Sequence, residues 1–257
     1  MLDKERQDRI IQFLRQKVYA SVHELSELTE TSEATVRRDL TKLEDGGQIH
    51  RVRGGAELSP SRLNQTQTPR ELPLSYRAEL YTPEKKRIAK AASELCSNGE
   101  TIFIDGGSTT LHMAPHLLAN ELQIVTNSFA IARELLKTGN NRIILPGGML
   151  YPDSELILNP FGEEAYSGYL ASKVFIGAGA ITESGIMNND MLIIHAEKAM
   201  IEHGRDIVVL ADSSKFLQQG RFVLCDFERI SAMITDSNIT ERHRKMMADK
   251  GIRLLTV

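Results

Sequence analysis

Cysteines are scarce in this 257-residue chain, which holds only Cys96 and Cys225. The two lie far apart and form no C-x-x-C spacing, which argues against a disulfide framework and against a zinc site. No apolar run approaches the roughly 18 residues that a membrane span needs. The charged N-terminus is not followed by the apolar stretch of a secretory signal. These absences predict a cytoplasmic protein without a membrane partner and without a bound metal.

An excess of positive charge is also absent. The chain holds 31 Lys plus Arg against 34 Asp plus Glu, a formal net charge of -3. This balance excludes a polycationic nucleic-acid coat. A hydrophobic content of 41% suffices for one sizeable core and one small core, so two domains of unequal size are expected.

Two short helices joined by a tight turn are predicted over Ala20–Asp39. Ser21 followed by Glu24 has the spacing of a capping box, in which each residue satisfies a backbone N–H at the start of a helix. Ser32 is a second N-cap candidate. A preceding helix over about Asp3–Lys17 offers apolar side chains for a small shared core. Such an arrangement presents a helix to the major groove of DNA.

The second helix carries a polar, locally basic face, because its apolar residues Val36, Leu40 and Leu43 must point inward. Arginine can donate bidentate hydrogen bonds to guanine, while Ser, Thr and Lys can contact bases or phosphates. Beyond this helix, Gln48–Leu58 predicts a short β-wing that turns at Gly54-Gly55. The residues predicted to contact DNA are Ser21, Ser32, Thr35, Arg37, Arg38, Lys42, Arg51 and Arg53.

An alternative interpretation makes Arg37 and Arg38 ordinary surface charges. The caps, the short turn and the wing agree with one another and favour DNA contact. Residues 1–58 nevertheless hold ten Lys plus Arg and eleven Asp plus Glu, so this domain is not basic overall. Affinity should therefore depend on where the charges lie and on two or more copies in a homo-oligomer, a dimer or a tetramer.

The segment from about Lys4 to Leu58 resembles the N-terminal domain of the DeoR/GlpR family of bacterial repressors. The similarity rests on Ser32-x-x-Thr-Val-Arg-Arg-Asp-Leu40 and on Arg53-Gly-Gly-Ala56. The resemblance implies a winged helix-turn-helix whose second helix enters the major groove.

A stretch rich in Ser, Thr, Gln and Pro, Ser59–Pro73, cannot build a core and predicts a linker. Thr82 as N-cap and Pro83 at the first helical position then open a helix. We predict a DNA-binding domain over residues 1–58, a linker over 59–83, and an effector-binding and oligomerisation domain over 84–257.

From Glu84 onward, short apolar strands alternate with helices, which predicts a mostly parallel, Rossmann-like α/β sheet covered on both faces. The predicted strands are Thr101–Ile104, Leu122–Val125, Arg142–Leu145, Lys173–Gly179, Asp206–Ala211, Ala232–Asp236 and Arg253–Val257. The predicted helices are Lys85–Cys96, one ending at Leu118, one ending at Leu136, Leu192–His203 and Thr240–Asp249.

Ligands bind such sheets at the carboxyl ends of the strands, where five polar or glycine-rich loops are predicted. In Asp105–Thr110, glycines admit a close ligand, hydroxyls donate, and the following helix N-terminus favours an anion. The loop is neither a Walker loop nor G-x-G-x-x-G, so no nucleotide cofactor is expected. Each glycine alone could merely permit a turn, but five equivalent loops favour a shared pocket. The predicted effector-binding residues are Asp105, Gly106, Gly107, Ser108, Thr109, Thr110, Thr126, Asn127, Gly147, Gly148, Gly179, Glu197, Lys198, Asp212 and Lys215.

Residues from about Lys85 to Val257 resemble the sensor domain of the same repressor family, which shares its fold with ribose-5-phosphate isomerase. This resemblance raises the alternative of a sugar-phosphate isomerase-like enzyme with an accessory DNA-binding domain. In the isomerases, paired acidic residues follow the strand that here reads Phe175–Ile181, where this chain has glycine and alanine. Glu197-Lys198 and Asp212–Lys215 resemble groups that the isomerases use. Glu197 either bonds a sugar hydroxyl or is a solvated helix carboxylate.

Binding groups are thus retained while part of the catalytic set is missing, so no catalytic residue is assigned. Within the family, Lys86–Ala92, Gly107–Thr109, Asn189–Met191 and Asp212–Lys215 are most similar to the ascorbate-utilisation repressor branch. We predict a repressor of a carbohydrate-catabolism operon, released from double-stranded operator DNA by a phosphorylated sugar or sugar-acid effector.

Overall fold

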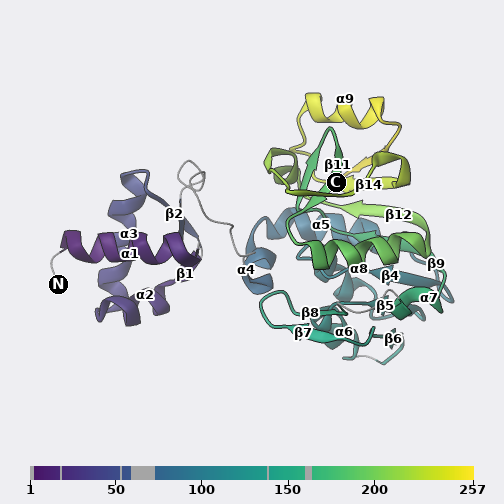
Figure 1. Cartoon of the computed structure of the whole chain (residues 1–257), viewed down its shortest axis with the longest axis horizontal. Helices are drawn as coiled ribbons and strands as arrows, with labels where there is room; N and C mark the ends of the chain where they lie inside the picture. The colour runs from purple at the N-terminus through teal and green to yellow at the C-terminus, as the bar shows by residue number, and fades with distance from the viewer. Residues whose placement is uncertain (1–2, 18, 53, 59–72, 138, 160–163) are drawn as a thin grey trace. The chain divides into compact units, whose positions relative to one another are not determined.

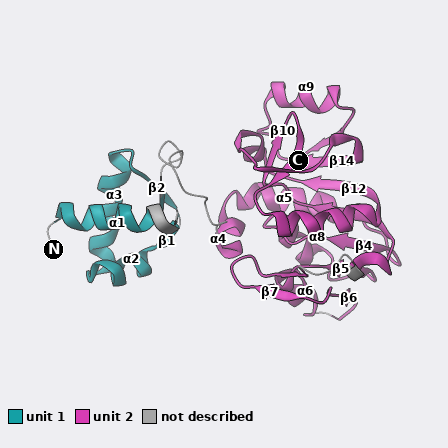
Figure 2. Ribbon diagram, in the orientation of Figure 1, with its two compact units in different colours: residues 1–72 teal, residues 73–257 magenta. Residues whose placement is uncertain are grey.

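The computed structural model describes residues 3–17, 19–52, 54–58, 73–137, 139–159 and 164–257. The chain divides into two compact units, residues 1–72 and 73–257 (Figures 1 and 2). Residues 73–83, which the sequence assigned to the linker, belong to the second unit and include helix α4 (Leu74–Glu79). The remaining linker residues from 59 to 72 lie outside the described residues.

The first unit combines a helix-turn-helix with a small antiparallel sheet in the order β1-β3-β2. Its elements are α1 (Asp3–Lys17), β1 (Tyr19–Ser21), α2 (Val22–Thr29), α3 (Glu33–Asp45), β2 (Ile49–Val52) and β3 (Gly55–Leu58). The predicted helices and wing are confirmed. Both predicted caps are present, since Ser21 accepts from the backbone of Glu24 and Ser32 accepts from the backbone of Thr35.

Strand β1 is an addition that the sequence did not predict, because three residues carry too little pattern to mark a strand. β1 pairs with β3, and the pairing accounts for Gly55. A Cβ atom at Gly55 would lie 2.2 Å from the carbonyl oxygen of Ala20. Only glycine therefore allows the wing to close against β1.

A buried ion pair ties α1 to the recognition helix α3. Arg6 is 6% exposed and Asp39 is 1% exposed. The Arg6 Nε donates to Asp39 Oδ2 at 2.5 Å and its Nη2 donates to Asp39 Oδ1 at 3.1 Å. Gln7 donates to the same carboxylate at 3.1 Å. The aspartate of the Arg-Arg-Asp-Leu motif thus orients the helix that carries the arginines.

The second unit is built on a seven-stranded parallel sheet in the order β15-β14-β12-β9-β4-β5-β6. Its strands are β4 (Thr101–Ile104), β5 (Gln123–Thr126), β6 (Arg142–Ile144), β9 (Ala171–Ile176), β12 (Gly204–Leu210), β14 (Ala232–Thr235) and β15 (Arg253–Thr256). The predicted Rossmann-like α/β class is confirmed.

Helices cover both faces of this sheet (Figure 1). Ile102 and Ile104 face a cluster that includes α5 (Thr82–Ser93), 3₁₀ helix η2 (Thr110–His116) and α6 (Phe129–Leu135). Phe103 faces the opposite cluster, which includes α7 (Glu164–Ser167), α8 (Met191–Glu202) and α9 (Glu241–Asp249). The alternation along β4 is the period of two that a strand buried on both sides requires.

The order of the strands places a topological switch point between β4 and β9. The chain runs outward through β4, β5 and β6, then returns to β9 on the other side of β4 and continues through β12, β14 and β15. Loops after β4 and β9 therefore diverge at the carboxyl edge, which is where open α/β sheets bind ligands.

Two local predictions were wrong. The helix expected to end at Leu118 is η2, a 3₁₀ helix with Pro115 inside it, because proline cannot supply the backbone donor of an α-helical turn. Tyr81, with φ of 54°, takes the N-cap position assigned to Thr82. The hydroxyl of Thr82 instead donates to the carbonyls of Ala78 and Glu79.

Several short elements were not predicted. They are the hairpin β7 (Met149–Tyr151) and β8 (Leu156–Leu158), the small sheet β10 (Ala180–Thr182), β11 (Gly185–Asn188) and β13 (Phe222–Cys225), and the 3₁₀ helices η3 (Ser213–Leu217) and η4 (Phe227–Arg229). Each is five residues or fewer. Within the described part of the chain, we find no helix of the length and apolar character needed to traverse a lipid bilayer.

Replacing Asp39 by Asn is expected to destabilise α3 by about 3 kcal/mol, because the Arg6 guanidinium would lose its buried counter-charge and keep only the exposed carboxylate of Asp3. Hydrogen exchange of the α3 amides in the full chain measures the opening free energy. Asp45→Asn, at an exposed position of the same helix, is the control and should stay within about 0.5 kcal/mol. Equal protection in both variants would contradict the role of the ion pair.

Candidate functional site

The recognition helix α3 exposes Arg37, Arg38 and Lys42 to solvent. Two of these cations have acidic partners within the unit. Arg37 Nη2 lies 3.1 Å from Glu33 Oε2, and Lys42 Nζ lies 3.2 Å from Asp3 Oδ2. Exposed ion pairs of this kind contribute little to stability. They can therefore open when a phosphate approaches, at a modest cost to DNA affinity.

The wing is tied to the C-terminal half of the recognition helix by Arg51. Its backbone N–H donates to Glu44 Oε1 at 2.9 Å, and its Nη1 donates to the Thr41 hydroxyl at 2.8 Å. Thr41 was not among the predicted DNA contacts. Arg53 lies outside the described residues, so its placement stays a prediction.

The two serines predicted to contact DNA are the N-cap residues of α2 and α3. Ser21 is half-buried and its oxygen accepts from Glu24 at 3.1 Å. Ser32 is exposed at the start of α3, and its hydroxyl lies 3.0 Å from that of Thr35. Contact of any of these groups with DNA remains a prediction.

In the second unit, hydrogen bonds connect the loop after β4 to the loop after β5 near the switch point. Asn127 donates to Asp105 Oδ1 at 2.8 Å and accepts from the Gly106 backbone at 2.7 Å. Both Asp105 and Asn127 are buried. A Cβ at Gly106 would lie 2.0 Å from a methyl carbon of Leu156 in β8, so a larger residue there would require Leu156 to move.

A second buried carboxylate comes from helix α8. Glu197 is 2% exposed, which excludes the alternative of a solvated helix carboxylate. Asn188, at the end of β11, donates to both Glu197 oxygens at 3.2 and 3.1 Å. Burial raises the pKa of Asp105, and hydrogen bonds with Asn127 and with Glu197 oppose that rise. The two carboxyls therefore lie close enough to interact, and a hydrogen bond between them requires that one of the two holds a proton.

A cationic cluster lies at the other end of the Asp105–Thr110 loop. Lys85, 2% exposed on α5, donates to the Ser108 hydroxyl at 3.0 Å and also to the carbonyl oxygen of Arg77. Burial lowers the pKa of Lys85 to about 8, while Asp212 opposes this shift and Lys215 and Arg77 add to it. The sequence did not indicate Lys85 or Arg77 as site residues, because a charged side chain on a helix is ordinarily exposed to solvent.

The loop after β12 is held in place by two aspartates. Asp212 caps η3 by accepting from the Ser214 backbone at 3.2 Å, and Asp236 accepts from the Ser213 backbone at 2.6 Å. Asp212 is 1% exposed, and its Oδ2 atom has no hydrogen-bond partner among the described residues. An unsatisfied buried carboxylate oxygen is costly and calls for a donor.

Other predicted effector residues form hydrogen bonds within their own loops. Thr110 exchanges hydrogen bonds with the backbone of Gly107, and the Thr126 hydroxyl accepts from the Ser128 backbone at 3.1 Å. Thr109 is buried in the same loop.

The remaining predicted effector residues are three glycines and one lysine. Gly147 and Gly148 follow the edge strand β6, and Gly148 packs against the backbone of β8. Gly179 packs against the backbone of β11. Lys198 is exposed beside the buried Glu197, so the side chains of this pair do not share one environment.

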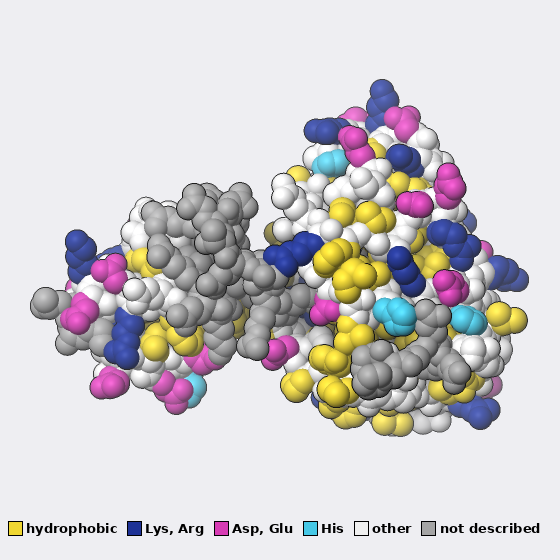
Figure 3. Space-filling view, viewed as in Figure 1, with side chains coloured by type: hydrophobic (Ala, Val, Ile, Leu, Met, Phe, Trp, Pro, Cys, Tyr) yellow, Lys and Arg dark blue, Asp and Glu magenta, His cyan; other side chains and the backbone are white. Residues whose placement is uncertain are grey.

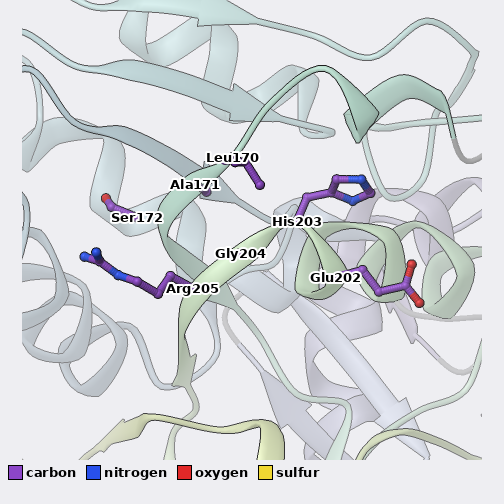
Figure 4. A pocket seen from close by; sticks show the side chains of 7 residues that line it. All are labelled: Leu170, Ala171, Ser172, Glu202, His203, Gly204 and Arg205. Carbon is purple, nitrogen blue, oxygen red and sulfur yellow. The ribbon is translucent and has the colours of Figure 1, made fainter.

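A cavity of about 390 Å³ lies at the opposite, amino-terminal edge of the sheet (Figure 4). It opens where β9 and β12 begin, and its lining residues are Leu170, Ala171, Ser172, Glu202, His203, Gly204 and Arg205. It shares no residue with the predicted effector loops. In the described part of the chain no group of three His, Cys, Asp or Glu side chains is placed to hold a metal ion.

Comparisons with known proteins match both units. A model of the DeoR-like helix-turn-helix domain matches residues 6–62, and a model of the DeoR C terminal sensor domain matches residues 81–237. The HTH-type transcriptional regulator UlaR of Shigella dysenteriae serotype 1 is 30% identical over 257 residues, all of both chains. UlaR of Escherichia coli strain SMS-3-5 has the same identity and coverage. This chain belongs to the DeoR family.

As a DeoR-family member with full-length relatives among transcriptional regulators, the chain is a DNA-binding transcriptional regulator and not an enzyme. The predicted family is confirmed, and so is the similarity to the ascorbate-utilisation branch, since the relatives bear the name UlaR.

Solved structures give partial likenesses to this DeoR-family chain. Ribose 5 phosphate isomerase A from Neisseria gonorrhoeae has a TM-score of 0.38 at 17% identity, over 54% of this chain and 53% of that one. The eIF2B delta subunit from Chaetomium thermophilum has a TM-score of 0.44 at 18% identity, over 60% of this chain and 56% of that one. The assignment to the family does not depend on either.

Replacing Arg38 by Ala is expected to weaken binding to the DNA upstream of the regulator's own gene by about 1–3 kcal/mol, because an exposed cation on α3 would be lost. Fluorescence anisotropy over a salt series measures both the affinity and its salt slope. Arg9→Ala, at an exposed position on α1, is the matched control and should change little.

Glu33→Gln tests the same surface in the opposite direction. It releases Arg37 from its ion pair, so the DNA affinity should rise. Parent-like affinity in Arg38→Ala would mean that α3 does not lie against the DNA.

Proposed function

We propose that this DeoR-family regulator is a cytoplasmic repressor of a carbohydrate-catabolism operon and leaves its operator when a phosphorylated sugar or sugar acid binds at the β4–β9 switch point. The observation that carries the proposal is the buried ammonium of Lys85. It contacts the Ser108 hydroxyl in the loop after β4 and the Arg77 carbonyl next to the linker.

A phosphate is the ligand that suits this cluster. Burying an ammonium is expensive unless an anion or several acceptors surround it. Lys215 and Arg77 each act to lower the pKa of Lys85, and Asp212 acts to raise it. The hydroxyl of Ser108 and the third N–H of Lys85 can donate to phosphate oxygens. A dianion would therefore relieve a local excess of positive charge.

The same cluster offers a route from the effector to the DNA-binding unit. Helix α4 is the first described element after the linker. Two carbonyl oxygens near its end are contacted by residues of the second unit. Lys85 donates to the Arg77 carbonyl, and the His112 ring of η2 lies 3.2 Å from the Ala78 carbonyl. A phosphate carries a full negative charge, so it attracts the Lys85 ammonium more strongly than a carbonyl dipole does. Phosphate bound to the third N–H of Lys85 would thus draw the ammonium away from the Arg77 carbonyl and loosen the end of α4.

An assembly of two or more copies supports the same function, because two operator half-sites require two recognition helices. Hydrophobic side chains gather on one face of the second unit over α8 and the β7–β8 hairpin (Figure 3). Met149, Leu150 and Met191 are each about half exposed or more there. Apolar surface of this kind is typical of protein interfaces, so we place the homo-oligomer contact on this face.

Lys85→Gln is expected to weaken sugar-phosphate binding at least about tenfold at pH 7, because the cation is lost while a hydrogen-bond donor remains. A thermal-shift screen with pentose, hexose, glycerol and sugar-acid phosphates identifies the strongest ligand, and calorimetry then gives its affinity. Lys86→Gln, the exposed neighbour on α5, is the control. A screen without any shift would count against the proposed effector class.

The pH dependence provides a further check on the same variant. Because the pKa of Lys85 is lowered to about 8, the free site loses its proton above pH 8, whereas bound phosphate stabilises the ammonium. Affinity should therefore fall as the pH rises above about 8, by up to about tenfold per unit. Lys85→Gln should lack this fall.

His112→Leu is expected to leave the affinity for the strongest ligand within about twofold, yet to change the factor by which that ligand weakens operator binding by about threefold or more. The reason is that the hydrogen bond of His112 goes to the Ala78 carbonyl of α4, while Lys85 acts on the ring only through its charge. Burial lowers the pKa of His112, so the neutral ring donates to Ala78 at pH 7. Anisotropy with and without ligand measures the factor.

His112→Gln, which keeps a donor, should restore the parent coupling. His116→Leu, exposed on the same 3₁₀ helix, should not alter it. An unchanged coupling in His112→Leu would contradict transmission through α4.

A further inference from the structure

One cation of the DNA-binding unit is held at the junction between the recognition helix and the wing. Arg51 lies in β2, and two of its donors reach the C-terminal half of α3. Its backbone N–H donates to Glu44 Oε1 at 2.9 Å, and its Nη1 donates to the Thr41 hydroxyl at 2.8 Å. The backbone and the side chain of Arg51 are thus both fixed relative to α3.

The hydrogen of the Thr41 hydroxyl is already used within α3. It is donated to the carbonyl oxygen of Arg37, one helical turn earlier, at 3.0 Å. A hydroxyl has a single hydrogen to donate, so what remains is its capacity to accept. Thr41 uses that capacity on Arg51. In this arrangement Thr41 therefore has no donor for a phosphate oxygen, and its effect on DNA binding must pass through Arg51.

Arg51 differs from the other exposed cations of α3 in the group that it contacts. Arg37 and Lys42 are each paired with a carboxylate, which a phosphate would have to displace. The Arg51 guanidinium instead donates to a neutral hydroxyl, so this contact leaves its positive charge uncompensated. A guanidinium has several N–H groups, and Arg51 is exposed. Donors therefore remain for a phosphate.

The position of Arg51 along the recognition helix suits a phosphate better than a base. In a helix-turn-helix, the N-terminal residues of the second helix contact base edges. Thr41 and Glu44 lie in the other half of α3, which spans Glu33–Asp45. A side chain held there faces the rim of the groove, where phosphate oxygens are the acceptors.

We infer that Thr41 and Glu44 are positioning residues that hold Arg51 in place for a DNA phosphate before the DNA binds. An arginine that is already fixed in its bound conformation loses less conformational entropy on binding. The sequence did not indicate either positioning residue. The inference concerns the DNA-binding unit alone and does not depend on the proposed effector.

Fluorescence anisotropy on the full chain over a salt series separates a lost charge from a lost position. The probes are the DNA upstream of the regulator's own gene and a duplex of random sequence, because phosphate contacts carry no sequence information. Arg51→Ala should weaken binding about fivefold or more and lower the salt slope by about one per bound copy. Thr41→Val should weaken binding about three- to tenfold with the slope unchanged, because the charge remains.

Two comparisons show whether Thr41 acts through Arg51. Thr41→Ser keeps the hydroxyl and should bind within about twofold of the parent. In the Arg51→Ala background, Thr41→Val should have no further effect beyond about twofold. An equal loss in both backgrounds, or parent-like binding of Thr41→Val alone, would overturn the role of Thr41. An unchanged salt slope in Arg51→Ala would overturn the phosphate contact.

A matched pair of variants at Glu44 tests the backbone contact, whose acceptor Oε1 also lies 3.8 Å from His50 Nδ1. Glu44→Gln and Glu44→Leu both remove the negative charge, but only Gln keeps a side-chain oxygen for the Arg51 N–H. Glu44→Gln should therefore bind both probes about threefold or more tightly than Glu44→Leu. Asp45→Gln and Asp45→Leu, at the exposed neighbouring position, are the control pair and should differ by less than about twofold. Equal affinities of the two Glu44 variants would overturn the role of Glu44.

Discussion

The parallel pairing of β4 with β9 is the constraint on which the second unit depends. It divides the sheet into two halves that run outward in opposite directions, so the loops after these strands separate at the carboxyl edge. Asp105 and Ser108 lie in one of these loops, and α8, which carries Glu197, follows β9 in the chain. The pairing therefore sets the place at which the loop after β4 meets α8, while Lys85 of α5 and Asp212 after β12 join the site from neighbouring elements.

Buried charge then decides what the proposed site can bind. Lys85 is desolvated and placed between a loop hydroxyl and a carbonyl next to the linker, whereas Asp105 and Glu197 are desolvated against each other. Each arrangement is costly without a ligand. An anion would relieve the first and hydroxyl donors would satisfy the second. The DNA-binding unit uses its charges differently, because Arg37 and Lys42 remain exposed and only loosely paired.

Much of the fold could be predicted because its signals are local. The caps at Ser21 and Ser32 and the repeat of Val36, Leu40 and Leu43 lie within a few residues of one another, and the seven core strands are apolar runs. Elements of three to five residues, such as β1 and β7, carry too little pattern. The helix expected to end at Leu118 is of the 3₁₀ type because Pro115 lies inside it.

By itself the sequence determined the helix-turn-helix, the α/β class, the family resemblance and the loops at the carboxyl edge, since each depends on residues close together in the chain. Only the tertiary structure decided that Lys85 and Arg77 join Ser108, that Glu197 meets Asp105, and that Lys198 stays exposed beside it. Burial and long-range contact depend on how distant segments pack. A lysine on a helix looks the same in sequence whether it faces water or a buried anion site.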